Sequence, residues 1–286
     1  MHRGHTSGKG WRALLAGTGM VAATGGFVLV GGATVVPQGP PALQATLHPN
    51  HFTAKPGGGG GNAASSALGW ASSNWSGYAI TASSPSHFSS LTGKWTVPSV
   101  SRTRKATYSA AWAGIDGFNN SSLIQTGTEQ DYYNGSAHYA AWWTTSAQGF
   151  LEQRIAQPVS PGDPMKATMS GSGTSWTMTL ADNAPSHPWS FTMGPITYTG
   201  PGASAEWIME APTVGGRVAP LAHYSTFAFD SGTVNGVAPG LTANEGGEII
   251  QGSQVVSIPS GPDKDLVLPD GFAIAYGSTP PATPAS

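Results

Sequence analysis

Two glutamates, Glu206 and Glu210, carry the most concentrated chemistry in this sequence. Within the run 203–212 they alternate with apolar residues, and the Trp and Ile between them favour a β-strand. Because positions i, i+2 and i+4 of a strand point the same way, both carboxylates are expected to share one face. Buried carboxylates are costly unless they are paired or protonated, so this face is either wet surface or a functional site.

A polar amide and another carboxylate lie far upstream of this strand. Gln125 is the single strong hydrogen-bonding side chain in the run 123–127, and Asp116 ends the preceding apolar run at a turn flanked by glycine. For Gln125 the plain alternative is an exposed strand residue. For Asp116 it is an acid that binds backbone amides in its own turn. The residues alone leave these alternatives open.

Other catalytic patterns are missing from the sequence. It has no G-x-S-x-G elbow, no P-loop, no dinucleotide fingerprint and no histidine pair at metal-ligand spacing. The histidines of the predicted domain are isolated and are expected to be surface or hydrogen-bonded residues: His87, His138, His187 and His223. Cysteine is absent, which excludes disulfides, thiolate metal sites and a cysteine nucleophile. We therefore expect no metal and no cofactor.

The charge content argues against a nucleic-acid partner. Only 9% of residues are charged and the formal net charge is −2. Binding to phosphates requires clustered Lys and Arg, and the densest basic group, Arg102–Lys105, is a predicted solvated loop.

Composition divides the chain into four parts. Residues 1–36 have a basic start and an uncharged apolar stretch, the pattern of a cleaved secretory signal, with an uncut anchor as the alternative. Residues 37–69 are rich in Pro, Gly and Ala and are predicted to be a pro-segment or linker outside the folded domain. We place a β-sandwich domain at 70–278 and a disordered tail at 279–286. We expect a secreted protein without membrane contact after signal cleavage.

Short runs of β-favouring residues follow one another at intervals of about 8 to 12 residues, which is typical of a sandwich or barrel. No segment keeps a helical period over three turns without Gly or Pro, so almost no helix is expected. The fold class predicted is all-β. The predicted strands include 75–80, 94–97, 107–115, 150–155, 165–169, 176–180 and 272–276.

Four motifs occur in one order along this domain: Ser73–Tyr78, Ala111–Gly117, Leu123–Gly127 and Ala205–Glu210. Their order and rough spacing resemble those of the glutamic peptidases, the eqolisin family. The resemblance covers nearly all of residues 73–277, and the cysteine-free, signal-bearing form looks like a bacterial-type member.

The resemblance implies a sandwich of two large antiparallel sheets, of concanavalin A-like or jelly-roll type, with one face that binds an extended peptide. It also implies a catalytic dyad of a Gln and a Glu, which by motif are Gln125 and Glu210. By the same matching, Trp75 and Trp112 resemble aromatic residues that line the substrate site. Asp116 resembles an acid that supports the site from behind.

This chain departs from the family pattern, among other places, after Trp142 and in the pro-segment. Trp142 is a predicted substrate contact, but the residues that follow it, 144–146, stand where a Glu and an aromatic-Tyr-Pro sequence are expected. Tryptophans in a sandwich are more often core anchors, which is the alternative for Trp142. The predicted pro-segment has few basic residues, namely His48, His51 and Lys55. The sequence thus gives weak support for the release of a basic pro-peptide by carboxylate protonation.

The chemistry of a Gln and Glu pair fits peptide hydrolysis. An ionised Glu210 can take a proton from water as the water attacks the scissile carbonyl, and can then protonate the leaving amine. Gln125 offers a neutral amide donor to the developing oxyanion, worth roughly 3 to 4 kcal/mol. The amide does not titrate, and a carboxylate with an ordinary pKa of about 4.3 acts as a base near or above that pH. An acidic pH optimum is therefore expected.

The resulting prediction is a monomeric, secreted, cofactor-free acid endopeptidase that acts on polypeptides, with Glu206 as a further substrate contact. One alternative is a jelly-roll glycoside hydrolase that uses Glu206 and Glu210. Positions i and i+4 of a strand are about 13 Å apart at the backbone, too far for a retaining pair unless the side chains converge. The other alternative is a carbohydrate- or peptide-binding sandwich that cuts nothing.

Overall fold

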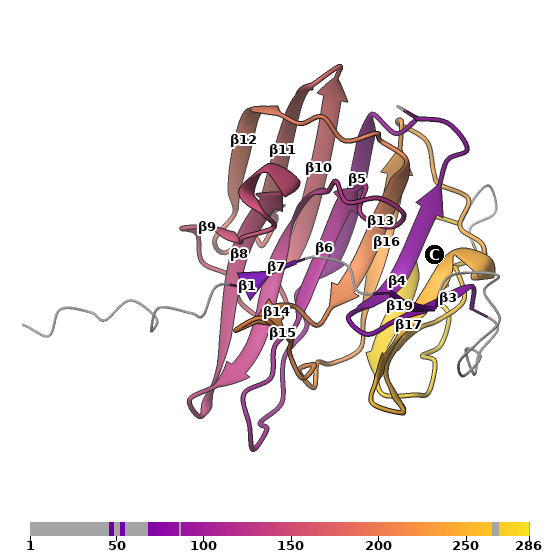
Figure 1. Ribbon diagram of the computed structural model, residues 1–286. Helices are drawn as coiled ribbons and strands as arrows, with labels where there is room; N and C mark the ends of the chain where they lie inside the picture. Colours follow the sequence, from indigo (N-terminus) through magenta and orange to yellow (C-terminus); the bar gives the residue numbers. More distant parts are fainter. Residues whose placement is uncertain (1–45, 49–51, 55–67, 86, 265–268, 286) are drawn as a thin grey trace, which may run out of the picture. The chain divides into compact units, whose positions relative to one another are not determined.

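The residues described by the computed structural model are 46–48, 52–54, 68–85, 87–264 and 269–285, and they all lie in one unit, Leu43–Ser286 (Figure 1). The predicted signal region, 1–36, lies outside the described residues. The helices found among the described residues are short 3₁₀ turns, η1 at Ser146–Gln148 and η2 at Ala243–Glu245. In this part of the chain no helix has the length and hydrophobicity needed to cross a membrane.

Strands make up most of the described chain. In chain order they are β1 Thr46–Leu47, β2 Phe52–Ala54, β3 Trp70–Ser72, β4 Trp75–Thr81, β5 Ser90–Thr96, β6 Ala110–Ile115, β7 Ile124–Tyr133, β8 Ser136–Thr145, β9 Gln153–Ile155, β10 Pro164–Ser172, β11 Ser175–Asp182, β12 Trp189–Thr197, β13 Ser204–Glu210, β14 Thr213–Val214, β15 Arg217–Val218, β16 Phe227–Val234, β17 Gly246–Gln251, β18 Gln254–Pro259 and β19 Phe272–Tyr276.

Two packed layers form the body of this unit, which confirms the predicted all-β sandwich. Their hydrogen-bonded order is continuous: β12-β11-β10-β5-β16-β19-β18-β17-β4-β13-β6-β7-β8-β9. Strand β5 of one layer packs against β6 of the other, and β11 packs against β7 (Figure 1). The indole nitrogen of Trp207 in β13 donates to the carbonyl of Thr92 in β5 across this interface, at 2.8 Å. The layers are thus two halves of one folded sheet rather than two separate sheets.

Side chains along β13 alternate between its two faces, which determines which of them enter the core between the layers. Trp207 and Met209 point into that core, while Ile208 packs on the opposite side of the strand. Because strand side chains alternate, Glu206 and Glu210 lie on the side of Ile208. The prediction that both carboxylates share one face is therefore confirmed.

Two of the predicted strands are shorter than expected. The predicted strand 150–155 is a strand only from Gln153, because η1 ends at Gly149 and Phe150 has φ of 64°, a left-handed backbone conformation that interrupts a strand. The predicted strand 107–115 begins only at Ala110.

Part of the segment 37–69 packs on the domain, contrary to the expectation that it lies outside. Strand β1 pairs with β14, and β14 pairs with β15, which makes a small three-stranded sheet. Thr46 lies opposite Val214, and Leu47 opposite Thr213. Strand β2 pairs with β3 at the edge of the large sheet. Whether this segment acts as a pro-segment stays a prediction.

Candidate active site

One face of the large sheet gathers the side chains singled out by sequence. This face, called the site face below, is the side of β4, β13, β6, β7 and β8 turned away from the core between the layers. It carries an apolar cluster that is separate from that core. Each predicted site residue is 0% exposed, and those on the site face are Trp75, Trp112, Gln125, Trp142, Glu206 and Glu210.

Strand register fixes the spacing between the two predicted catalytic residues. Glu210 in β13 lies opposite Ala110 in β6, whereas Gln125 in β7 lies opposite Gly114. Trp112 lies between those two positions of β6 and points to the same face. The two residues therefore lie on the same face, at register positions on either side of Trp112.

Glu210 is buried and held by neutral donors. The indole nitrogen of Trp112 donates to Glu210 Oε2 at 2.8 Å, and the side-chain amide of Asn74 donates to Oε1 at 3.4 Å. A carboxylate is acceptor-only when it is ionised, so these donors suit the charged form. Sequence reasoning had not assigned a role to Asn74, although it lies in the first of the four motifs.

His48, from the segment expected to lie outside the domain, occupies the space between the two predicted catalytic residues. Its Nδ1 lies 3.0 Å from Glu210 Oε2. The side-chain amide of Gln125 donates to the backbone carbonyl of His48 at 3.3 Å. The imidazole stacks on Trp142 with ring centroids 3.8 Å apart and planes 2° from parallel. Gln125, Glu210 and Trp142 thus meet at one residue of an extended segment.

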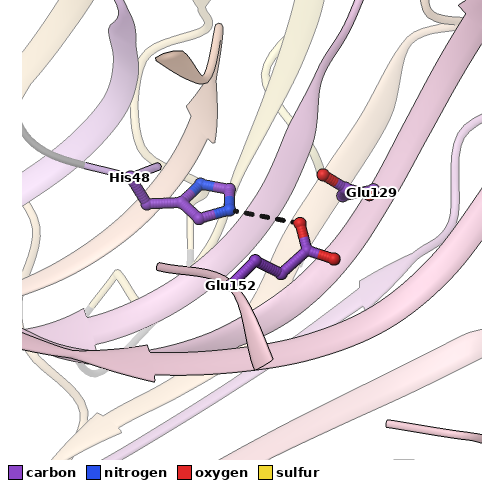
Figure 2. Close-up of side chains that lie close together, drawn as sticks. All are labelled: His48, Glu129 and Glu152. Carbon is purple, nitrogen blue, oxygen red and sulfur yellow. Dashed lines mark ion pairs between the residues drawn. The ribbon is translucent and has the colours of Figure 1, made fainter. Parts of the chain in front are cut away.

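A second carboxylate faces the other nitrogen of this imidazole. His48 Nε2 lies 3.7 Å from a carboxylate oxygen of Glu152, an ion-pair distance longer than a hydrogen bond (Figure 2). Burial by itself would lower the pKa of His48, but the charges of Glu210 and Glu152 outweigh burial and raise the pKa to about 9. His48 is therefore an imidazolium at neutral and acid pH.

Glu152 belongs to a buried acidic group that one arginine balances. Arg154 Nε lies 3.0 Å from Glu152, and a terminal nitrogen of Arg154 donates to Glu129 at 2.6 Å. Burial raises the pKa of Glu129 well above its ordinary range and that of Asp131 to about 8. For Glu152 burial acts the same way, but His48, Glu129 and Arg154 outweigh it and lower the pKa. Of these three acids, Glu152 is the one that stays charged.

The same residues could be considered as metal ligands. His48, Glu129 and Glu152 each place a ligand atom within 4.8 Å of the others (Figure 2). The guanidinium of Arg154 already contacts both carboxylates, and His48 Nδ1 already faces Glu210. A cation is therefore present among these acids in the form of Arg154, and the donor set does not call for a metal.

The predicted tryptophans all reach the site face but differ in their contacts. Trp112 packs edge-on against Trp75, with ring centroids 4.8 Å apart and planes at 74°. Trp142 lies in the same cross-strand row as Trp112, with Gly127 of β7 between them. Trp142 contacts the extended segment directly through His48. Trp142 belongs to the buried apolar cluster of the site face and not to the core between the layers, and its role as a substrate contact stays a prediction.

Glu206 is on the site face, but it lies at a different position of the strand from Glu210. Its strand neighbours are Ala79 and Gly114, while those of Glu210 are Trp75 and Ala110. Neither carboxylate oxygen of Glu206 has a hydrogen-bond partner among the described residues. Burial raises the pKa of Glu206 well above its ordinary range, and the charge of Asp116 adds to the effect. Glu206 is therefore a neutral acid over the acid range.

Asp116 anchors a turn instead of facing the segment that contains His48. The backbone N–H groups of Gly202 and Ala203 each donate to its carboxylate at 2.8 Å. The Tyr198 hydroxyl donates at 2.7 Å and the Asn120 amide at 3.0 Å. Among the hydrogen bonds of the described residues, none joins Asp116 to the predicted dyad. The alternative weighed from sequence, an acid that binds backbone amides in its own turn, names the right kind of partner but the wrong place, because the amides belong to Gly202 and Ala203, far along the chain.

The fold and the convergence of Gln125 and Glu210 on one peptide segment define a β-sandwich of the glutamic peptidase type. The chain belongs to the Peptidase A4 family, whose model matches residues 73–257, more than half of the sequence. This finding confirms the family to which the four motifs pointed.

Relatives of this chain include fungal and structurally characterised peptidases. It is similar to Aspergillopepsin-2 of Aspergillus niger, with 28% identity over 188 residues that cover 55% of this chain and 62% of that protein. It thus spans less than two thirds of that relative. The fold is similar to that of scytalido-glutamic peptidase solved with a transition state analog inhibitor, with a TM-score of 0.57, 22% identity and coverage of 71% of this chain and 98% of the other. It is also similar to SCP-B, an eqolisin solved with the tripeptide Ala-Ile-His, with a TM-score of 0.53, 23% identity and the same coverage.

Proposed function

We propose that this chain is a secreted acid endopeptidase that hydrolyses peptide bonds of protein substrates with Gln125 and Glu210. The observation that carries the proposal is the convergence of both side chains on the backbone carbonyl and ring of His48. Family membership supports a peptidase. The enzyme is proposed to act as a monomer on polypeptides, without a nucleic-acid or membrane partner once the signal is removed.

In the proposed mechanism, Glu210 is the general base and then the general acid. Its carboxylate, oriented by Trp112 and Asn74, takes a proton from a water that attacks the scissile carbonyl. The side-chain amide of Gln125 donates to the carbonyl oxygen as negative charge develops there. The protonated Glu210 then gives its proton to the leaving amine, which breaks the C–N bond and restores the carboxylate.

An extended peptide fits beside these residues because the chain already binds one. Thr46 and Leu47 pair with β14, and the backbone N–H of Glu152 donates to the carbonyl of Thr46 at 3.1 Å. Pairing of main chains is a common way to hold an extended peptide. The tripeptide bound to SCP-B, Ala-Ile-His, has the same pattern of a small, an aliphatic and a histidine residue as Thr46–His48. This parallel supports the peptide as the substrate class.

The glycoside hydrolase alternative has less support from the site. A retaining pair needs one ionised nucleophile and one acid about 5 Å apart. Glu206 and Glu210 are separated by the strand row of Ile208, which puts their backbone positions about 13 Å apart. The peptidase therefore remains the proposal.

Hydrolysis of a denatured protein at pH values from about 2 to 7, which bracket carboxylate titration, tests the proposal. The wild type should cut in acid. Gln125→Ala should lower kcat by about 10²- to 10³-fold, as loss of one oxyanion donor does. Glu210→Gln should abolish hydrolysis because no base remains. Full activity of Glu210→Gln, or an inert wild type after removal of residues up to 69, would refute the assignment.

A further inference from the structure

Two aspartates and a histidine meet at one end of strands β10, β11 and β12, in the layer that does not carry the site face. Asp163 precedes β10, Asp182 ends β11, and His187 lies in the turn that leads into β12. Met165 of β10 and Trp189 of β12 both lie opposite Asp182, so the antiparallel register brings the three residues to the same place. One ligand-type atom of each lies within 4.8 Å of those of the other two.

Each of these side chains uses its other polar atom to bind a neighbour in the same turns. The backbone N–H of Ser160 donates to Asp163 Oδ2 at 2.6 Å, and the backbone N–H of Ala184 donates to Asp182 Oδ1 at 2.7 Å. The hydroxyl of the preceding serine lies 2.7 Å from Nδ1 of His187. Hydrogen bonds to the outer atoms are how proteins orient metal ligands, and here they leave one oxygen of each aspartate and Nε2 of the histidine facing one another.

The free oxygen of Asp182 shows that this group lacks a partner. Asp182 is 1% exposed, and its Oδ2 has no hydrogen-bond partner among the described residues although it faces the other two ligand atoms. Asp163 is 5% exposed. Within the described part of the chain, the ion pairs of both aspartates involve His187 and no lysine or arginine. Buried carboxylates need a cation, and one imidazolium would balance only one of the two charges.

A single hydrogen bond from the histidine does not account for this arrangement. Nε2 lies 3.2 Å from Asp163 Oδ1, 3.3 Å from Asp163 Oδ2 and 3.5 Å from Asp182 Oδ2. It carries at most one N–H, which cannot serve both aspartates well, and 3.5 Å exceeds a normal N–H···O distance. The separations do fit a tetrahedral zinc ion, because Zn–N and Zn–O bonds of about 2.0 to 2.1 Å put neighbouring ligand atoms about 3.3 to 3.4 Å apart.

We infer that Asp163, Asp182 and His187 bind a divalent transition-metal ion of the zinc type, which fastens the turn before β10 to the β11–β12 hairpin. An imidazole nitrogen with carboxylate oxygens suits zinc and cobalt, whereas calcium and magnesium take oxygen ligands. A charge of +2 balances both aspartates. His187 is 35% exposed, so the ion can enter from solvent and keep water in its fourth position. The inference goes beyond the proposed function and does not depend on it.

The sequence carries no local motif for this zinc site. The expectation of no metal rested partly on the absence of a histidine pair at metal-ligand spacing, and His187 was expected to be a surface or hydrogen-bonded residue. The site uses a single histidine, and one of its aspartates lies 24 residues earlier in the chain. Strand register, and not a short motif, brings the ligands together.

Titration calorimetry of the full chain with zinc chloride at about pH 7.5, where metal ligands are deprotonated, tests the site. Wild type should bind zinc, and His187→Ala and Asp182→Asn should each weaken the affinity at least about tenfold. Asp182→Asn retains an oxygen for the N–H of Ala184, which keeps the turn intact. His223→Ala and Asp230→Asn change an exposed histidine and an exposed acid of a separate acidic group, and both should bind like wild type.

A second set of measurements separates loss of binding from loss of folding. Zinc at about 100 times its Kd should raise the Tm of wild type by about 5 to 10 °C, and a chelator should reverse the change. Calcium at the same concentration should not. Without metal, the Tm of His187→Ala and Asp182→Asn should stay within a few degrees of wild type. Cobalt bound to wild type should show the visible absorption of a four-coordinate ion, and this absorption should be missing in His187→Ala.

The inference is overturned if wild type binds no zinc, or if its affinity is unchanged in both His187→Ala and Asp182→Asn. Loss of binding in Asp230→Asn but not in Asp182→Asn would place the ion in the other acidic group and would also overturn it. A Tm rise with calcium equal to that with zinc would show that the class of ion is wrong. None of these outcomes bears on hydrolysis by Gln125 and Glu210, which the acid assay tests separately.

Discussion

Replacing Asp116 by asparagine tests whether this acid anchors its turn or supports the substrate site. The buried carboxylate receives two backbone N–H groups and two side-chain donors, with Tyr198 and Gly202 on Oδ2 and Ala203 and Asn120 on Oδ1. An asparagine keeps one oxygen and turns the other into a donor. Whichever way the amide is oriented, the backbone N–H of Gly202 or of Ala203 then faces an NH₂ group and loses its acceptor.

The cost can be worked from this geometry. A hydrogen bond to a charged group contributes about 1.5 to 3 kcal/mol, and a donor left unpaired in a buried place adds to the loss. We expect Asp116→Asn to lower the free energy of unfolding by about 3 kcal/mol. Tyr198→Phe removes one donor and leaves both backbone N–H groups paired, so it should cost about 1 to 2 kcal/mol. The φ of 69° at Asp116 does not add to the difference, because asparagine tolerates this conformation.

The assay is urea unfolding followed by tryptophan fluorescence, in a Glu210→Gln background so that unfolded molecules are not digested. In the catalytically intact chain, kcat/KM of Asp116→Asn at 25 °C should stay within about threefold of wild type, because in the described part of the chain no hydrogen bond joins this residue to the dyad. A variant with wild-type stability and a hundredfold loss of kcat/KM would refute the anchoring role. It would favour the role implied by the family resemblance, an acid that supports the site from behind.

Two further substitutions test the site face. Glu206→Gln should leave activity at about pH 4 within twofold of wild type, since burial keeps the native residue neutral. Glu206 ionises above about pH 4.5 in the unfolded chain but stays protonated in the folded chain, so wild-type stability falls as pH rises. The Tm of Glu206→Gln relative to wild type should therefore increase from pH 4.5 to 7. Equal Tm differences at pH 4 and 7 would contradict this. Gly127→Ala should destabilise by about 1 to 3 kcal/mol, because the new Cβ would lie 2.3 Å from the carbonyl oxygen of Ala111 and 2.5 Å from Cβ of Trp112. An unchanged Tm and kcat would show that Trp112 has room to move.

Local patterns were enough to predict the sandwich and the face on which its acids lie. Strand alternation depends on a backbone period of two residues, so the sequence around Glu206 and Glu210 predicts their shared face without knowledge of any neighbour. The strand predicted at 150–155 failed at Phe150 because a left-handed residue in a short turn has no pattern of its own.

The role of Asp116 and the place of His48 could not be predicted in this way. Both depend on residues far along the chain: Gly202 and Ala203 for the aspartate, and Glu210 and Glu152 for the histidine. Single histidines in a region rich in Pro and Gly carry no signal for such contacts. The residues that His48 contacts depend on where its segment crosses the folded sheet.

A count of basic residues in the 37–69 segment does not describe how strongly one of them is bound. Such a count treats each cation as equal, as it is in water, where two charges at 4 Å attract by only about 1 kcal/mol. His48 is fully buried between Glu210 and Glu152, and attraction between charges grows severalfold as the surroundings become less polar. Burial also keeps Glu129 and Asp131 from competing for the imidazolium, because both stay protonated in acid. One buried histidine between Glu210 and Glu152 is therefore attracted more strongly than a lysine on the surface would be.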